Sequence, residues 1–172
     1  DAVKSHAIKI LMNSCYGVLG TPACRFYDPR LANAITGFGR EMLLWCHARI
    51  EAGGRRVLYG DTDSLFVETR AEDAAAARDT GAALAASLNA ELARHVAERW
   101  RVASRLELVF DRLYLRLFLP PVRHGTTGAR KRYAGLADGP RGPHVVFTGL
   151  EAVRGDWTAL AREVQRELFG RL

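Results

Sequence analysis

The chain has 172 residues, of which 48% are hydrophobic and 26% are charged, and its formal net charge is +6. This composition is ordinary for a soluble globular protein, and the length suffices for one sizeable core. No apolar run approaches the roughly 20 residues that span a bilayer, which excludes a membrane-spanning helix, and the start has neither an initiator Met nor a signal-peptide core. We therefore expect a cytoplasmic protein without membrane contacts, and a segment of something longer.

Charge is unevenly distributed along the sequence. The net charge is +4 over residues 1–60, −2 over residues 61–120 and +4 over residues 121–172. An acidic cluster between basic flanks suits a divalent metal site beside a polyanion, although solvated surface charge gives a similar pattern. Cys15, Cys24 and Cys46 lack the spacing of a metal site, and we expect buried free thiols.

Two helices are predicted at the start of the chain. Apolar residues recur at helical spacing from Ile8 to Leu19, and Gly17 and Gly20 favour an end near there. Asp28 followed by Pro29 is typical of a helix start, and Gly53-Gly54 of a helix end. The residues expected to face inward on this second helix are Leu31, Ala34, Ile35, Phe38, Met42, Trp45 and Cys46.

The rest of the chain alternates strands with helices. Residues 57–59 and 65–69 predict a hairpin, residues 72–100 a long helix that is irregular at Gly81, and residues 106–110 and 113–119 two strands. Residues 132–136 and 144–148 predict two more strands, and Asp156 is expected to cap a last amphipathic helix that carries Trp157, Leu160, Val164 and Leu168 on one side. The sum is an α+β fold, an antiparallel sheet with packed helices.

The predicted hairpin carries the clearest chemical signal. Asp61 and Asp63 lie one residue apart in the turn, and hard oxygen ligands at this spacing suit one or two Mg²⁺ ions for phosphoryl transfer. A solvated turn or a calcium-like loop remains the alternative for this motif alone.

Two further motifs are compatible with a polyanionic ligand. Lys9, Asn13 and Tyr16 share one face of the first helix, where they could reach a nucleotide, or could form a polar stripe without a ligand. Residues 130–133 join three cations to an aromatic residue, which indicates a phosphate-backbone contact or a solvated strand edge.

In this order, Lys9-x-x-x-Asn-Ser-x-Tyr-Gly17, Tyr59-Gly-Asp-Thr-Asp-Ser64 and Arg130-Lys-Arg-Tyr133 resemble motif B, motif C and the KKRY motif of the family B DNA polymerases. Residues 16–31, 131–136 and 147–157 are similar to the bacterial polymerase II branch of that family. The resemblance covers nearly the whole chain. It implies a fingers helix over residues 1–20, a polymerase palm with a palm-type sheet over residues 21–150, and the start of the thumb over residues 151–172.

The resemblance also implies a role for each motif residue. Asp63 would bind the catalytic Mg²⁺ ions and Asp61 would support it; Lys9 would contact the phosphates of the incoming deoxynucleoside triphosphate. Asn13 would line the nucleotide pocket, and Tyr16 would pack beneath the nascent base pair. The residues implied to hold primer-template DNA are Arg130, Lys131, Arg132 and Tyr133. A sliding clamp, bound through other regions, is a further partner that the resemblance allows.

Two departures from the family pattern affect the expected activity. Arg130 stands where the tetrad usually begins with Lys. No motif A sequence of the type Asp-x-x-Ser-Leu-Tyr-Pro occurs, so the second metal-binding Asp is absent, and we expect these residues alone to be inactive. A non-catalytic nucleic-acid-binding module is the main alternative. Another metal-dependent phosphotransferase is a third hypothesis, which the motif from Lys9 to Gly17 disfavours.

Overall fold

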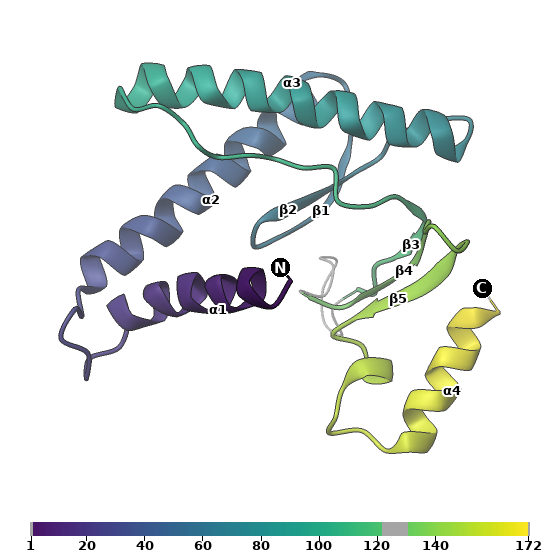
Figure 1. Ribbon diagram of the computed structural model, residues 1–172. Coiled ribbons are helices and arrows are strands. Elements are labelled where there is room, and N and C mark those ends of the chain that lie inside the picture. The colour runs from purple at the N-terminus through teal and green to yellow at the C-terminus, as the bar shows by residue number, and fades with distance from the viewer. Residues whose placement is uncertain (1, 122–130, 172) are drawn as a thin grey trace. The chain divides into compact units, whose positions relative to one another are not determined.

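The computed structural model describes residues 2–121 and 131–171 of the chain (Figure 1). The chain divides into two compact units after Ala48. The first unit holds α1 (Ala2–Leu19) and most of α2 (Pro29–Ala52). The elements of the second unit are β1 (Val57–Asp61), β2 (Ser64–Val67), α3 (Ala74–Trp100), β3 (Tyr114–Phe118), β4 (Tyr133–Ala137), β5 (His144–Thr148), the 3-10 helix η1 (Glu151–Val153) and α4 (Ala159–Gly170).

The strands of the described ranges are all antiparallel, but they form two sheets rather than the single sheet expected. β1 pairs with β2, and a separate sheet has the order β3-β4-β5. Helices and antiparallel strands together confirm the α+β class. No helix within residues 2–121 and 131–171 has both the length and the apolar character needed to cross a bilayer.

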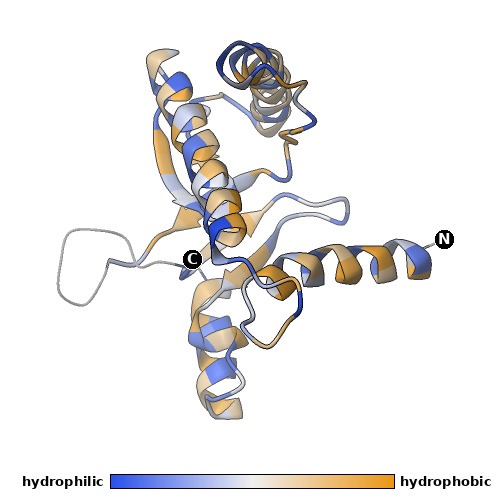
Figure 2. Ribbon diagram, turned by 90° about the vertical axis from the view of Figure 1, so that its left-hand side faces the viewer, coloured by the Kyte–Doolittle hydropathy of each residue, from blue (hydrophilic) through white to orange (hydrophobic). Residues whose placement is uncertain are grey.

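The two helices of the first unit begin and end where the sequence predicts. Asp28 accepts a hydrogen bond from the Arg30 N–H at 2.9 Å, which caps α2, and the φ of 78° at Gly54 lets the chain turn away after it. The apolar residues of α1, a helix with many orange segments in Figure 2, are largely exposed to solvent. The exposed fraction is 57% for Ile8 and 67% for Leu11.

The prediction of an inward face on α2 holds only in its second half. Met42 and Cys46 are buried, whereas Leu31 and Ile35 are about half exposed. The expectation of buried thiols is likewise wrong at Cys15, which is exposed, and right at Cys46, where burial raises the pKa of the thiol.

α3 is one continuous helix, which corrects the expected irregularity at Gly81. Asp73 caps it by accepting the Ala76 N–H at 2.8 Å. A Cβ on Gly81 would lie 2.6 Å from two ring atoms of Phe110. The glycine therefore allows the aromatic ring to approach the helix closely, and does not interrupt it.

The segment from Leu106 to Phe110 is not the strand that its alternation predicts. It runs back along α3 (Figure 1), and the Asn89 side chain on that helix replaces the missing sheet partner. The Asn89 amide donates to the Leu108 carbonyl and accepts from the Leu108 N–H, both at 2.8 Å. One side chain thus satisfies both backbone groups of Leu108, as a neighbouring strand would.

We expect Asn89→Asp to destabilise the chain by about 1–3 kcal/mol, because a carboxylate cannot donate to the Leu108 carbonyl and leaves it unpaired. Asn33→Asp, at an exposed position of α2, is the matched control. Urea unfolding of the purified chain measures the difference. Equal midpoints for the two variants would show that the Asn89 bridge does not hold this segment.

The β4 and β5 strands lead directly into the C-terminal elements. Tyr133 lies opposite Thr148 in their register, so the start of β4 is beside the end of β5. The last helix begins later than expected: Thr158, not Asp156, caps α4 by accepting the Ala161 N–H at 3.3 Å. Asp156 instead pairs with Arg154, since an arginine two residues away is within reach of its carboxylate.

Candidate functional site

Asp61 and Asp63 lie together at the tip of the β1-β2 hairpin. Asp61 is the last residue of β1 and pairs across the turn with Ser64, so Thr62 and Asp63 form the turn itself. Asp63 is exposed, whereas the Asp61 side chain is only 23% exposed. The location of the two carboxylates at one tip agrees with the hairpin expected from the sequence.

The turn is unusually tight for its residue types. Thr62 has a φ of 53°, and the Asp63 N–H donates to the Asp61 carbonyl at 2.6 Å, an i to i+2 bond. A positive φ is uncommon for a β-branched residue and is retained where the surrounding structure fixes it. The Thr62 hydroxyl and Asp61 Oδ1 are 3.0 Å apart, which restrains the Asp61 carboxylate.

Lys131 lies beside this hairpin, although it is far away in the sequence. Its Nζ is 3.9 Å from Asp61 Oδ1, and its backbone N–H donates to the Tyr59 hydroxyl at 2.7 Å. An open depression is lined by Tyr59, Gly60, Asp61, Thr62 and Lys131. The fold therefore brings a lysine of the basic tetrad next to the acidic turn.

Aromatic side chains connect the two sheets, and one of them, Tyr59, also lines the depression. The Tyr59 ring centroid is 5.5 Å from that of Phe66 and 6.0 Å from that of Tyr133, and Phe66 lies 5.7 Å from Tyr114. Edge-to-face and stacked pairs at such distances stabilise an interface beyond its buried area. Burial raises the pKa of Tyr114 above its ordinary value.

Tyr59 was missed as a functional candidate by reasoning from the sequence. Its place beside the acidic turn was visible there, but a tyrosine in a β-rich run is an ordinary core residue. The Tyr59 hydroxyl also accepts a hydrogen bond from the Lys131 N–H. Tyr59 therefore fixes the backbone of the lysine that lies beside Asp61.

The remaining tetrad residues have different surroundings. Tyr133 begins β4 within the aromatic cluster, and Arg132 is ion-paired with Glu151. Arg130 lies outside the described residues. Only Lys131 of the described tetrad residues is exposed.

Lys9, Asn13 and Tyr16 all lie on α1, as the sequence predicts. They fall at i, i+4 and i+7, which places them on one side of an α-helix, and all are exposed. They belong to the first unit, and the hairpin belongs to the second. Their shared helical face agrees with the expected spacing.

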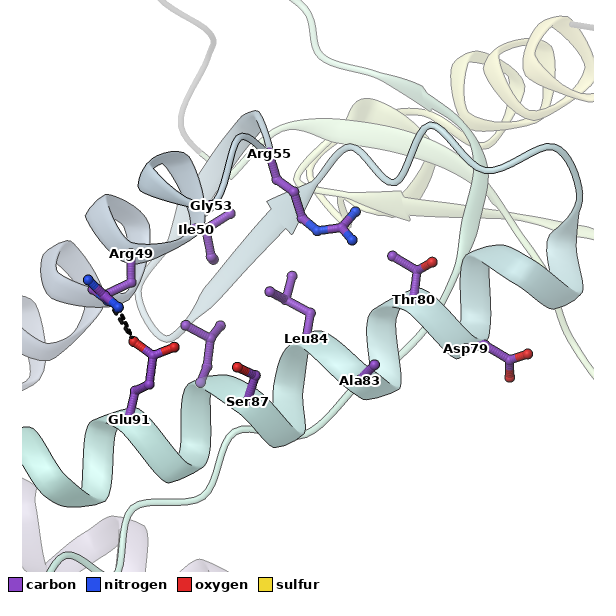
Figure 3. Close-up of a pocket in the computed structure, with 11 residues that line it drawn as sticks. Arg49, Ile50, Gly53, Arg55, Asp79, Thr80, Ala83, Leu84, Ser87 and Glu91 are labelled. Atoms are coloured by element: carbon purple, nitrogen blue, oxygen red, sulfur yellow. Dashed lines mark hydrogen bonds and ion pairs between the residues drawn. The ribbon is translucent and has the colours of Figure 1, made fainter.

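A larger open groove in the second unit contains none of these residues. It lies between the last turn of α2 and α3, where Arg49 and Glu91 form an ion pair (Figure 3). Arg55 and Asp79 also line it. The charges of Arg49 and Glu91 within the groove thus neutralise each other.

The hairpin carries two carboxylates that are chemically suited to a metal ion. Within the part of the chain that the structure describes, no three side chains of His, Cys, Asp or Glu group together as a metal site. Asp61 and Asp63 have the hard oxygen atoms that Mg²⁺ prefers. They fit a site to which another segment contributes the remaining ligands.

This arrangement defines an α+β protein that presents an acidic hairpin beside a cationic strand end. The family model of DNA polymerase family B matches residues 3–172. The chain is 46% identical to DNA polymerase II of Escherichia coli over 169 residues, which are 98% of this chain and 22% of that protein.

Two archaeal proteins are similar as well. DNA polymerase 2 of Aeropyrum pernix is 35% identical over 94% of the chain and 17% of its own length. The DNA polymerase of Archaeoglobus fulgidus is 34% identical over 97% of the chain and 18% of its own length. The chain thus spans about a fifth of the length of these three relatives, and it belongs to DNA polymerase family B.

Proposed function

We propose that the chain is the fingers, palm and thumb-entrance segment of a DNA-directed DNA polymerase, which adds deoxynucleotides to a primer 3′ end. The observation that supports this most is the approach of Lys131 Nζ to within 3.9 Å of Asp61 Oδ1. This contact places the acidic motif beside the basic one. A polymerase needs both: acids for metal-assisted phosphoryl transfer and a cation for the primer-template backbone. Family membership supports the same conclusion.

The two acidic residues of the turn have different parts in this proposal. Asp63 is the main metal ligand and Asp61, already restrained by Thr62 and Lys131, has the supporting role. Asp63 and Asp61 would hold metal ions there, and such ions would supply stabilisation of the charge on the attacking and leaving oxygen atoms. A third carboxylate comes from outside these residues, and the 172 residues alone are therefore inactive.

The residues of the other two motifs contact the nucleotide and the DNA. Lys9 contacts the triphosphate, Asn13 lines the nucleotide pocket, and Tyr16 packs beneath the nascent base pair. Lys131 and Tyr133 contact the primer-template duplex through its backbone, without reading its sequence. The regions 1–20, 21–150 and 151–172 are assigned to fingers, palm and thumb.

We place the activity in the bacterial cytoplasm and nucleoid, in DNA repair or lesion bypass. This assignment rests on the resemblance to the polymerase II branch, with 46% identity to DNA polymerase II of Escherichia coli. Primer extension on templates with and without an abasic site tests it. A complete enzyme that stops at the lesion with no bypass product would contradict the lesion-bypass part.

Extension of a primed template by the complete protein that carries these residues tests the proposed activity, and Lys131→Gln tests the site. We expect metal-dependent extension by the parent protein. In the variant, affinity for primed DNA falls about tenfold, and the slope of log affinity against log salt decreases by about 0.9, the value for one phosphate contact.

Arg141→Gln is the matched control, because it removes one positive charge from the turn at the opposite end of β4. Its DNA affinity should stay close to that of the parent protein. DNA binding without any extension by the complete protein would favour the non-catalytic module. If the salt dependence of DNA binding were unchanged in Lys131→Gln, Lys131 would not contact the DNA backbone.

A further inference from the structure

Arg132 interacts with acidic and amide side chains of the C-terminal elements. Its guanidinium donates to Glu151 Oε1, on η1, and the side chain of Gln165, on α4, donates to Glu151 Oε2 at 2.8 Å. Both carboxylate oxygens of Glu151 are therefore used, each by a donor from a different element. The three residues connect the start of β4 with η1 and α4.

The same amide also fixes the backbone of η1. Gln165 Oε1 accepts the Ala152 N–H, and Arg166 donates to the Ala152 carbonyl at 2.7 Å. Ala152 itself is fully buried. A polar bond to buried backbone is expensive to break, so this connection is more rigid than a surface ion pair.

Arg132 is poorly placed to contact a phosphate directly. Its side chain is 36% exposed, and its Nε is buried without a hydrogen-bond partner among the described residues. The Glu151 side chain is only 16% exposed. A partly buried cation and acid that pair in this way would each lose a partner if either turned towards DNA.

Glu151 is held in its charged form by this arrangement. Its pKa is lowered first by the hydrogen bond from Gln165, and further by a backbone bond and by Arg132. These contacts therefore favour the ionised carboxylate over the protonated acid. Any stability that it adds is present above its ordinary pKa and is lost as the pH falls through the lowered value.

We propose that Glu151 and Gln165 are positioning residues for the DNA-contacting end of β4. They hold Arg132 against η1 and α4, and we call Arg132, Glu151 and Gln165 the anchor. The anchor fixes the backbone position from which Lys131 and Tyr133 contact the duplex. The inference rests on the proposed function, and it assigns Arg132 an indirect part in place of the DNA contact that the family resemblance implies. Gly149 strengthens the anchor, because it packs against the Lys131 carbonyl.

Glu151→Gln separates this proposal from simple electrostatics. Removing an acid beside a polyanion site should, by charge alone, tighten DNA binding, and freeing Arg132 should tighten it further. An amide offers one acceptor oxygen where the carboxylate offers two, so either Arg132 or Gln165 loses its partner. We therefore expect about tenfold weaker binding of primed DNA by the complete protein, the ratio that follows from one lost charge-assisted bond.

A double variant tests whether Arg132 acts through Glu151. Arg132→Gln should weaken DNA binding in the parent protein, but should change it by less than about twofold in the Glu151→Gln background, since the anchor is already broken. Glu167→Gln is the control, because it removes one acid from the exposed side of α4, and it should leave the affinity unchanged. Gln165→Leu changes no charge and should also weaken DNA binding. It replaces Glu151→Gln as the test if that variant does not fold.

The outcomes distinguish this inference from the proposed function. Tighter binding by Glu151→Gln, or an equal loss from Arg132→Gln in both backgrounds, would overturn the anchor while leaving the polymerase assignment intact. Unchanged affinity of a folded Gln165→Leu would also overturn it. A complete parent protein that neither binds nor extends primed DNA would instead refute the proposed function, and the anchor with it.

Discussion

Asp63→Asn should lower the rate of nucleotide incorporation by the complete protein at least about a thousandfold, which corresponds to about 4 kcal/mol of transition-state stabilisation. The change keeps the size of the side chain and removes the charge that a hard divalent ion needs. Asp63 is exposed in the turn, and within residues 2–121 and 131–171 it forms no ion pair that could compensate for the loss. Single-turnover extension of a primed template measures the rate.

DNA binding should survive this change, because the lost interaction is with metal and not with the backbone. Asp111→Asn is the matched control, since the side chain of Asp111 is 74% exposed and pairs only with its neighbour Arg112 among the described residues. Asp61→Asn should have a smaller effect on the rate than Asp63→Asn. If Asp63→Asn kept more than about a tenth of the parent rate, Asp63 would not be a primary metal ligand.

Gly149→Ala should be the most disruptive of the glycine-to-alanine changes among the described residues of the second unit. Its φ is +60°, and a Cβ there would lie 1.8 Å from the carbonyl oxygen of Lys131. Left-handed backbone costs alanine about 1–2 kcal/mol, and relieving such an overlap adds about 1–3 kcal/mol. We expect urea unfolding of the purified chain to show a loss of about 2–5 kcal/mol.

Two other glycines separate the causes of this loss. Gly142 has a φ of +101° but open space around its Cβ position, so Gly142→Ala measures backbone strain without a clash. Gly155 has open space and no positive φ, and Gly155→Ala should be nearly neutral. If Gly149→Ala were no more destabilising than Gly142→Ala, the close approach to Lys131 would not matter to stability.

Local signals in the sequence were reliable where one or two neighbouring residues decide the conformation. Asp28-Pro29 and Gly53-Gly54 correctly predict the ends of α2, because a cap and a left-handed residue act within one turn. The acidic turn is likewise confirmed between β1 and β2. Burial on α1 and on the first half of α2 was not predictable, since apolar spacing indicates a face but not what covers it.

The alternation of residues 106–110 shows how a local pattern can mislead. Period-two spacing predicts a strand, but a strand also needs a partner backbone, and here the Asn89 side chain takes its place. The sequence contains Asn89 as one polar residue of a long helix. Nothing in its neighbours indicates that it bridges to Leu108.

By itself, the sequence determined the chemistry of the candidate site: the acids of the turn, the cations before β4 and the family to which they belong. Only the tertiary structure decided which of these groups meet. Lys131 and Tyr59 are 72 residues apart in the chain, and Arg132 and Glu151 are 19 apart. Contacts at such separations depend on how the sheets and helices pack, because no local propensity or spacing acts over that distance.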